Sequence, residues 1–288
     1  MNAPHRRNAC PGLSTPMPTG DGLLARFLPA GRMALDAFTS FCDAAHRHGN
    51  GTIEVTARGS MQVRGLTPRS APMLAGEIAA LHIAADGLPV ITNPLSEDDA
   101  KIDTTALTVN LRRAIADARL ALAPKVSIVI DGGSPLHLDA LTADVRLGVI
   151  KATDGSRIHI ALGGDAATAM PLGTATPEET PEIVMRLLRV IASSRNGRAA
   201  DILRDEGIGA FRAVIEPPLD PAPPLPQRAP AEPVGRHQLC DGSFAFGVGL
   251  AFGHTDAEAL AQLTDVRHTR RTLGAAGART CVAVRQRF

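Results

Sequence analysis

Two arginines and a glutamine lie close together in the segment EVTARGSMQVRGL, which runs from residue 54 to residue 66. If this segment is a β-strand, the even spacing of Arg58, Gln62 and Arg64 places all three on one face, because side chains alternate across a strand. Two guanidinium groups beside an amide suit a ligand with several carboxylates, since arginine forms short, strong hydrogen bonds to carboxylates. The alternative is a half-buried strand whose basic face is only solvated.

The surrounding sequence predicts alternating strands and helices that would position this segment. The expected elements are, in chain order, a strand at 23–28, a turn at 29–31, a helix at 34–48, the strand at 54–66 and a helix at 71–82. A strand, helix, strand, helix order is typical of a sheet covered by helices on one face.

Farther along, strands and helices alternate again. The segments SIVIDGG (127–133) and RIHIALGG (157–164) predict buried strands that end in glycines. Residues 176–194 predict a helix with a threonine cap, early acidic residues and late arginines. The glycines of 163–173 lack the lysine and the spacing of a phosphate-binding loop, so we expect a turn where backbone approaches a ligand.

The segment from residue 216 to residue 233 is rich in proline, which excludes a helix interior or a central strand and predicts a semi-rigid spacer. After it, CDGSFAFGVGLAFGH repeats the order of turn, strand, turn and helix start seen near residue 20. Such a repeat indicates an internal duplication. From about Val266 the sequence becomes arginine-rich and loses its apolar stripe, as either a shifted reading frame or a basic terminal arm would produce.

Composition excludes several classes of protein. The 288 residues are 44% hydrophobic and 20% charged, with a formal net charge of +1, so no nucleic-acid footprint is indicated. No segment approaches the roughly 18 apolar residues that span a bilayer, and the N-terminus lacks the apolar run of a signal peptide. We therefore expect a cytoplasmic protein without nucleic-acid or membrane partners.

The segment GDGLLARFLPAGRMALDAFTSFCDAAHRHGNGTIEVTARGSMQVRGL resembles the ferredoxin-like half-domain of the nitrite and sulfite reductase family. PKVSIVIDGG, IALGGDAATAMPLG and RAADILRDEGIGAFRAVIE resemble the siroheme-binding module of that family. The resemblance implies an α+β fold with a ferredoxin-like half-domain, a siroheme-reductase-type α/β module and the start of a second pseudo-repeat. The expected divisions are an arm at 1–19, the half-domain at 20–87, the tetrapyrrole-binding module at 88–215, the linker at 216–233 and an incomplete second half at 234–288.

Within the family, RRNACPGLSTPMPTGDGLLAR looks most like an oxygen-dependent oxidoreductase of aerobic cobalamin biosynthesis. The resemblance implies that precorrin-3A is hydroxylated and forms a lactone with O2 and NADH, using a [4Fe-4S] cluster, a non-haem iron and an electron donor protein. It also implies that Arg26, Arg58 and Lys125 face the tetrapyrrole carboxylates. Together with Gln62 and Arg64, these residues form the predicted substrate-binding set.

The chain departs from the family pattern where the cluster should bind. The paired cysteines C-x5-C and C-x3-C are absent, and the cysteines stand isolated at Cys10, Cys42, Cys240 and Cys281. We therefore predict no metal ligands and an impaired enzyme that is cut short in its second half. The alternatives are a non-catalytic tetrapyrrole-binding half completed by a separate C-terminal fragment, or a sulfite or nitrite reductase relative. Ser127, where the family has a second lysine, argues against sulfite or nitrite chemistry.

Overall fold

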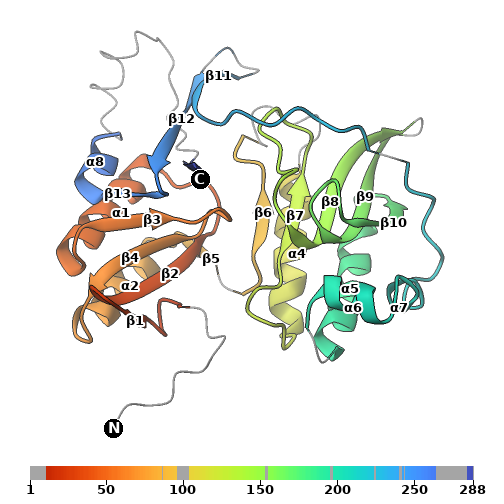
Figure 1. Ribbon diagram of the computed structural model, residues 1–288, viewed down its shortest axis with the longest axis horizontal. Coiled ribbons are helices and arrows are strands. Elements are labelled where there is room, and N and C mark those ends of the chain that lie inside the picture. Colours follow the sequence, from red (N-terminus) through yellow and green to blue (C-terminus); the bar gives the residue numbers. More distant parts are fainter. Residues whose placement is uncertain are drawn as a thin grey trace. The chain divides into compact units, whose positions relative to one another are not determined.

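A computed structural model describes residues 11–85, 87–95, 104–152, 155–194, 197–223, 225–239, 242, 244–263 and, for the backbone alone, 284–287 (Figure 1). The chain forms two compact units. Unit 1 comprises Met1–Asp86 with Pro233–Phe288, and unit 2 comprises Gly87–Glu232. Among the described residues, no helix has the length and apolar character needed to cross a membrane.

The first part of unit 1 is a sheet covered by two helices. Its elements are β1 (Met17–Thr19), β2 (Gly22–Pro29), α1 (Leu35–His48), β3 (Thr52–Val55), β4 (Met61–Leu66), α2 (Ser70–Ala80) and β5 (Ala84–Ala85). The sheet order is β1-β2-β4-β3-β13, where β13 (His254–Asp256) comes from the later part of the chain, and β5 pairs with β2. Alternate residues such as Phe27, Ile53 and Val63 are buried in one core with Phe41 of α1 and Ile78 of α2. Alternation thus directs the other face of these strands away from the helices.

Unit 1 also contains the segment that follows the proline-rich stretch. Its elements are β11 (Gly235–Gln238), β12 (Phe244–Ala251), β13 (His254–Asp256), α8 (Ala257–Gln262) and β14 (Val284–Arg287). β13 pairs antiparallel with β3, and α8 packs beside α1 (Figure 1). Asp256 caps α8 by accepting hydrogen bonds from the backbone N–H groups of Glu258 and Ala259. A strand and a helix therefore follow the proline-rich segment, as the sequence pattern predicted.

Unit 2 is a five-stranded sheet with helices against one face. Its elements are β6 (Val90–Thr92), α4 (Thr105–Ala118), β7 (Ile128–Asp131), β8 (Ala143–Ala152), β9 (Gly155–Gly164), β10 (Met170–Ala175), α5 (Thr180–Ser193), α6 (Ala199–Asp205) and α7 (Gly209–Arg212). The order is β10-β9-β8-β7-β6, with β6, β7 and β8 parallel and β8, β9 and β10 antiparallel. The buried strands predicted at 127–133 and 157–164 correspond to β7 and β9.

The helix predicted at 176–194 begins later than expected. Thr176 and Glu179 exchange hydrogen bonds in the turn before it, and α5 itself starts at Thr180 without a side-chain cap. Thr176 and Glu179 thus form a capping box, so the predicted threonine cap is present, one turn before the regular helix begins at Thr180.

The last part of unit 2, residues 216–223 and 225–232 and here named the strap, lies along the rest of that unit. Arg186 of α5 donates to the carbonyl of Glu216 at 3.1 Å, and the N–H of Thr174 donates to the carbonyl of Asp220 at 2.9 Å. Farther along, the Arg228 side chain binds two carboxylates of unit 2. The proline-rich segment is therefore anchored to one unit, whereas its composition alone predicted a spacer.

Candidate functional site

The strand predicted at residues 54–66 is in fact two antiparallel strands, β3 and β4, joined by a tight turn. Thr56 accepts a hydrogen bond from the N–H of Gly59 at 2.8 Å, and Gly59 has a φ of 75°. Arg58 lies exposed in this turn. The prediction that Arg58 shares a strand face with Gln62 and Arg64 is therefore wrong. Even spacing is compatible with either one strand or a hairpin, and the left-handed glycine reverses the chain.

Gln62 of β4 is the centre of a row of polar side chains across the sheet. It lies opposite Arg26 of β2 and opposite Glu54 of β3, so the three side chains share a face. Only one orientation of the Gln62 amide satisfies both neighbours. Its oxygen then accepts from Nη2 and Nε of Arg26 at 2.8 and 3.1 Å, and its nitrogen donates to Oε2 of Glu54 at 3.0 Å. Because Gln62 is only 5% exposed, these protein groups must satisfy its amide.

Arg64 extends the row toward the turn between β1 and β2. Its Nη1 donates to Oε1 of Glu54 at 2.8 Å, while Nε and Nη2 donate to the two carboxylate oxygens of Asp21 at 3.0 and 3.2 Å. The Asp21 carboxylate also accepts hydrogen bonds from Thr19 and Asn50. The Arg64 guanidinium, followed by the Thr19 hydroxyl, holds the pKa of Asp21 well below its usual range.

We call Arg26, Gln62, Glu54, Arg64 and Asp21 the polar row. It contains three of the five predicted binding residues and two carboxylates that were not predicted. Glu54 joins this face because the register of the β3–β4 hairpin sets it opposite Gln62. Asp21 lies far away in the sequence and is brought to Arg64 only by strand pairing.

The two arginines of the polar row differ in how their charge is balanced. The Arg64 guanidinium is paired with two carboxylates. Within the part of the chain that the structure describes, the Arg26 guanidinium contacts the neutral amide of Gln62 and pairs with no carboxylate. Arg26 therefore retains a positive charge that a ligand carboxylate could neutralise.

Lys125, the fifth predicted residue, belongs to unit 2, whereas the polar row belongs to unit 1. It is exposed in the turn before β7, which begins only at Ile128. Lys125 therefore lies before the strand that the sequence predicted at 127–133. An exposed lysine on a turn is a mobile point charge, unlike the fixed guanidinium of Arg26.

Unit 2 has a charged cluster of its own, which the sequence analysis missed. Arg228 of the strap donates through Nη2 to Asp131 at 2.7 Å and through Nε to Asp139 at 2.8 Å. His137 lies 2.7 Å from the carbonyl of Ala229, also in the strap. We call these contacts the Arg228 latch. Composition gave no sign of it, because an arginine among prolines looks like a solvated charge.

The latch contains a buried carboxylate, that of Asp131, which is 5% exposed. Burial raises the pKa of Asp131, but the Arg228 guanidinium and the N–H groups of Leu138 and Gly133 more than offset this, so the pKa lies below its ordinary value. Burial lowers the pKa of Arg228, but its hydrogen bonds to Asp139 and Asp131 outweigh this effect, so the pKa lies above its ordinary value. The charges of the latch are thus paired with each other.

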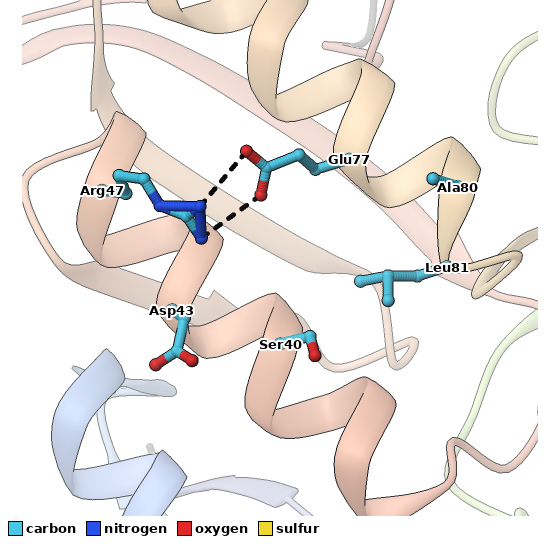
Figure 2. A pocket seen from close by; sticks show the side chains of 6 residues that line it. All are labelled: Ser40, Asp43, Arg47, Glu77, Ala80 and Leu81. Atoms are coloured by element: carbon cyan, nitrogen blue, oxygen red, sulfur yellow. Dashed lines mark hydrogen bonds and ion pairs between the residues drawn. The ribbon is translucent and has the colours of Figure 1, made fainter.

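A pocket of about 340 Å³ lies between α1 and α2, and it shares no residue with the polar row. Figure 2 shows its lining residues, which are Ser40, Asp43, Arg47, Glu77, Ala80 and Leu81. Glu77 pairs with Arg47 at 3.4 Å and with Nε2 of the buried His48 at 2.7 Å. Because Glu77 is paired with Arg47 and His48, the described lining of the pocket offers no unpaired basic group that would extend the polar row.

The described residues do not fit an iron–sulfur cluster. No group of three or more His, Cys, Asp or Glu side chains among them could hold a metal ion. Cys42 is buried in the core of unit 1, and burial raises the pKa of its thiol to about 12. Cluster ligands must be thiolates, so Cys42 is unsuited to that role. The remaining cysteines, Cys10, Cys240 and Cys281, lie outside the described residues.

Comparisons with known proteins agree with this architecture. Residues 15–81 match the model of the Nitrite/Sulfite reductase ferredoxin-like half domain. The chain is 37% identical over 277 residues to a precorrin-3B synthase from Sinorhizobium sp. The matched region covers 94% of this chain but only 59% of that relative. The structure of the NirA protein of Mycobacterium tuberculosis is similar with a TM-score of 0.69, at 21% identity, over 84% of this chain and 50% of that chain.

At that identity the likeness to the NirA protein shows the fold alone, and it confirms the predicted mixed α and β architecture. The chain therefore carries a nitrite/sulfite reductase ferredoxin-like half-domain and is similar over most of its length to a precorrin-3B synthase.

Proposed function

We propose that this chain binds the carboxylates of precorrin-3A and takes part in a precorrin-3B synthase reaction in the cytoplasm. The reaction would hydroxylate the macrocycle with O2 and close a lactone, with NADH as the indirect source of electrons. The observation that carries the proposal is the Arg26 guanidinium, which is held by the Gln62 amide and retains its charge. The 37% identity to a precorrin-3B synthase supports the choice of tetrapyrrole.

In this proposal the residues of the chain bind and orient the substrate. Arg26 would form a two-pronged, charge-assisted contact with one carboxylate, which fixes direction as well as distance. Arg58, exposed in the hairpin turn of the same unit, would add a contact to another carboxylate of the macrocycle. Lys125, exposed in unit 2, is a separate candidate for binding a carboxylate. Arg64 would serve mainly to hold Glu54 and Asp21 in place, because both carboxylates already occupy it.

A second candidate function is tetrapyrrole binding without catalysis, with a separate C-terminal polypeptide and an electron donor protein completing the enzyme. The observation in its favour is that the sequence contains neither a C-x5-C nor a C-x3-C pair of cysteines. The two candidates differ after anaerobic reconstitution with iron and sulfide. About four irons per chain and a broad absorption band would support the oxidoreductase, since that is the signature of a [4Fe-4S] cluster. A colourless, iron-free protein would support the binding function.

Substrate binding itself can be tested with uroporphyrin, a porphyrin that carries many carboxylates. Titration followed by the shift of its main absorption band should show saturable binding to the wild-type chain. Arg26→Ala should weaken binding roughly tenfold to a hundredfold, because it removes a hydrogen bond between charged groups. Arg113→Ala, at an exposed position of α4, is the matched control and should bind like the wild type. A wild-type chain that fails to bind, or an Arg26→Ala variant that binds normally, would overturn the proposal.

A further inference from the structure

Glu54 connects the two guanidinium groups of the polar row. One of its carboxylate oxygens accepts a hydrogen bond from Arg64 at 2.8 Å, and the other accepts from the amide nitrogen of Gln62 at 3.0 Å. The oxygen of the same amide accepts from Arg26. An ionised carboxylate only accepts, whereas an amide has one donor end and one acceptor end. The carboxylate of Glu54 therefore dictates which end of the Gln62 amide points toward Arg26.

We propose that Glu54 is a positioning residue that fixes the Gln62 amide and thereby holds Arg26 ready for a ligand carboxylate. This inference rests on the proposed function and names a further residue of the same site. Glu54 lies on β3, across β4 from Arg26 on β2, so it acts on Arg26 only through Gln62. Gln62 is buried, so a wrongly oriented amide would have no water to satisfy it.

Counting donors and acceptors gives a sharp test. In the wild type, the three contacts from Arg64 through Glu54 and Gln62 to Arg26 each join a donor to an acceptor. In Glu54→Gln the amides at positions 54 and 62 lie between the guanidinium groups of Arg64 and Arg26. Each guanidinium supplies one donor to these contacts and each amide supplies one donor and one acceptor, so there are four donors and two acceptors. One of the three contacts must then bring two donors together, whichever way the amides turn. The exchange of both residues, Glu54→Gln with Gln62→Glu, restores three matched contacts and the same net charge.

The exchange variant nevertheless differs from the wild type in one respect. Its carboxylate lies next to Arg26, where the wild type has a neutral amide oxygen. The hydrogen bonds of the sheet face are restored, but the charge of Arg26 is now neutralised from within. Stability and ligand affinity should therefore separate in this variant, which a merely structural role for Glu54 would not produce.

The experiment measures uroporphyrin binding and the midpoint of thermal unfolding for the full-length chain and its variants. Glu54→Gln should bind about tenfold more weakly and unfold about 4 °C lower, as expected for one lost charge-assisted contact. The exchange variant should regain the wild-type midpoint but bind at least tenfold more weakly than the wild type. Glu258→Gln, which removes one negative charge from an exposed position of α8, is the control and should match the wild type.

The direction in which porphyrin affinity changes in Glu54→Gln distinguishes a positioning role of Glu54 from a purely electrostatic effect of its charge. Removing a negative charge beside the site would by itself strengthen the binding of an anionic porphyrin. Equal or tighter binding by Glu54→Gln would therefore overturn the inference, as would an exchange variant whose unfolding midpoint is not restored. If the wild-type chain binds no porphyrin, the proposed function fails, but the unfolding midpoints still decide whether Glu54 orients Gln62.

Discussion

Replacing Arg228 with glutamine should release the strap from the rest of unit 2. The guanidinium lies 2.7 Å from Asp131, whose side chain is only 6% exposed, so the variant leaves a buried carboxylate without its counter-ion. Breaking a buried ion pair in this way costs about 3–5 kcal/mol. Asp131 keeps hydrogen bonds from the N–H groups of Gly133 and Leu138, and the Arg228 side chain is 32% exposed. We therefore expect a loss of about 2 kcal/mol at neutral pH.

The deficit of Arg228→Gln should depend on pH. In the wild type, burial raises the pKa of Asp131, but Arg228 and the backbone N–H groups lower it to a net value below 3.8. A group with a lowered folded pKa stabilises the protein above its unfolded pKa, and this stability is lost as the pH falls through the folded pKa. In the variant, burial still raises the pKa of Asp131, but Arg228 no longer lowers it, so this pKa is higher than in the wild type. The difference between the two proteins should therefore be largest near neutral pH, shrink as the pH falls through the higher pKa of Asp131 in the variant, and disappear below its lowered pKa in the wild type.

The assay must avoid intrinsic fluorescence, because the chain has no Trp and no Tyr. Urea unfolding followed by far-UV circular dichroism gives the free energy, and hydrogen exchange of residues 225–232 reports release of the strap. Arg157→Gln is the matched control, since Arg157 binds the strap through Asp220, which is 64% exposed. An exposed pair contributes at most about 1 kcal/mol. Equal losses in the two variants, or a deficit that grows in acid, would refute the account of the latch.

Three further predictions follow from packing and burial. Gly173→Val should destabilise unit 2 and loosen the strap, measured by urea unfolding, because even a Cβ at Gly173 would lie 2.4 Å from the Cβ of Leu219. Gly65→Ala should cost about 1–3 kcal/mol in the same assay, since Gly65 has a φ of 68° and its Cβ would meet the backbone nitrogen of Asn50 at 2.8 Å. Cys42 should resist iodoacetamide in the native protein, because burial raises its pKa to about 12; rapid native labelling found by peptide mapping would contradict this.

Local pattern was sufficient to predict most helices and strands. In α1 the buried residues Phe38, Phe41, Cys42 and Ala45 recur at helical spacing, Asp36 lies in the first turn and basic residues lie in the last. Such signals are contained within a few turns of chain. The prediction of a helix over residues 34–48 is accordingly confirmed by α1 at Leu35–His48.

The site was less predictable because its contacts join distant segments. Glu54, Gln62 and Arg26 meet through the register of three strands, which no local spacing specifies. Local pattern also failed at the hairpin, where Gly59 with its φ of 75° turns a seemingly continuous strand back on itself. The same limit applies to the strap, whose Arg228 reaches carboxylates about a hundred residues earlier in the chain, as its salt bridges show.

A group of basic residues therefore does not by itself make a binding site for carboxylates. Whether an arginine can bind a ligand carboxylate depends on the protein carboxylates with which it is already paired. A ligand carboxylate that approached Arg64 would have to displace Asp21 or Glu54 and leave that group without its counter-ion. A carboxylate that approached Arg26 would displace no carboxylate among the described residues, since the contact there is with the Gln62 amide. The polar row thus offers one guanidinium for ligand binding where the sequence pattern counted several. The other arginine, together with both acids, keeps that guanidinium in place.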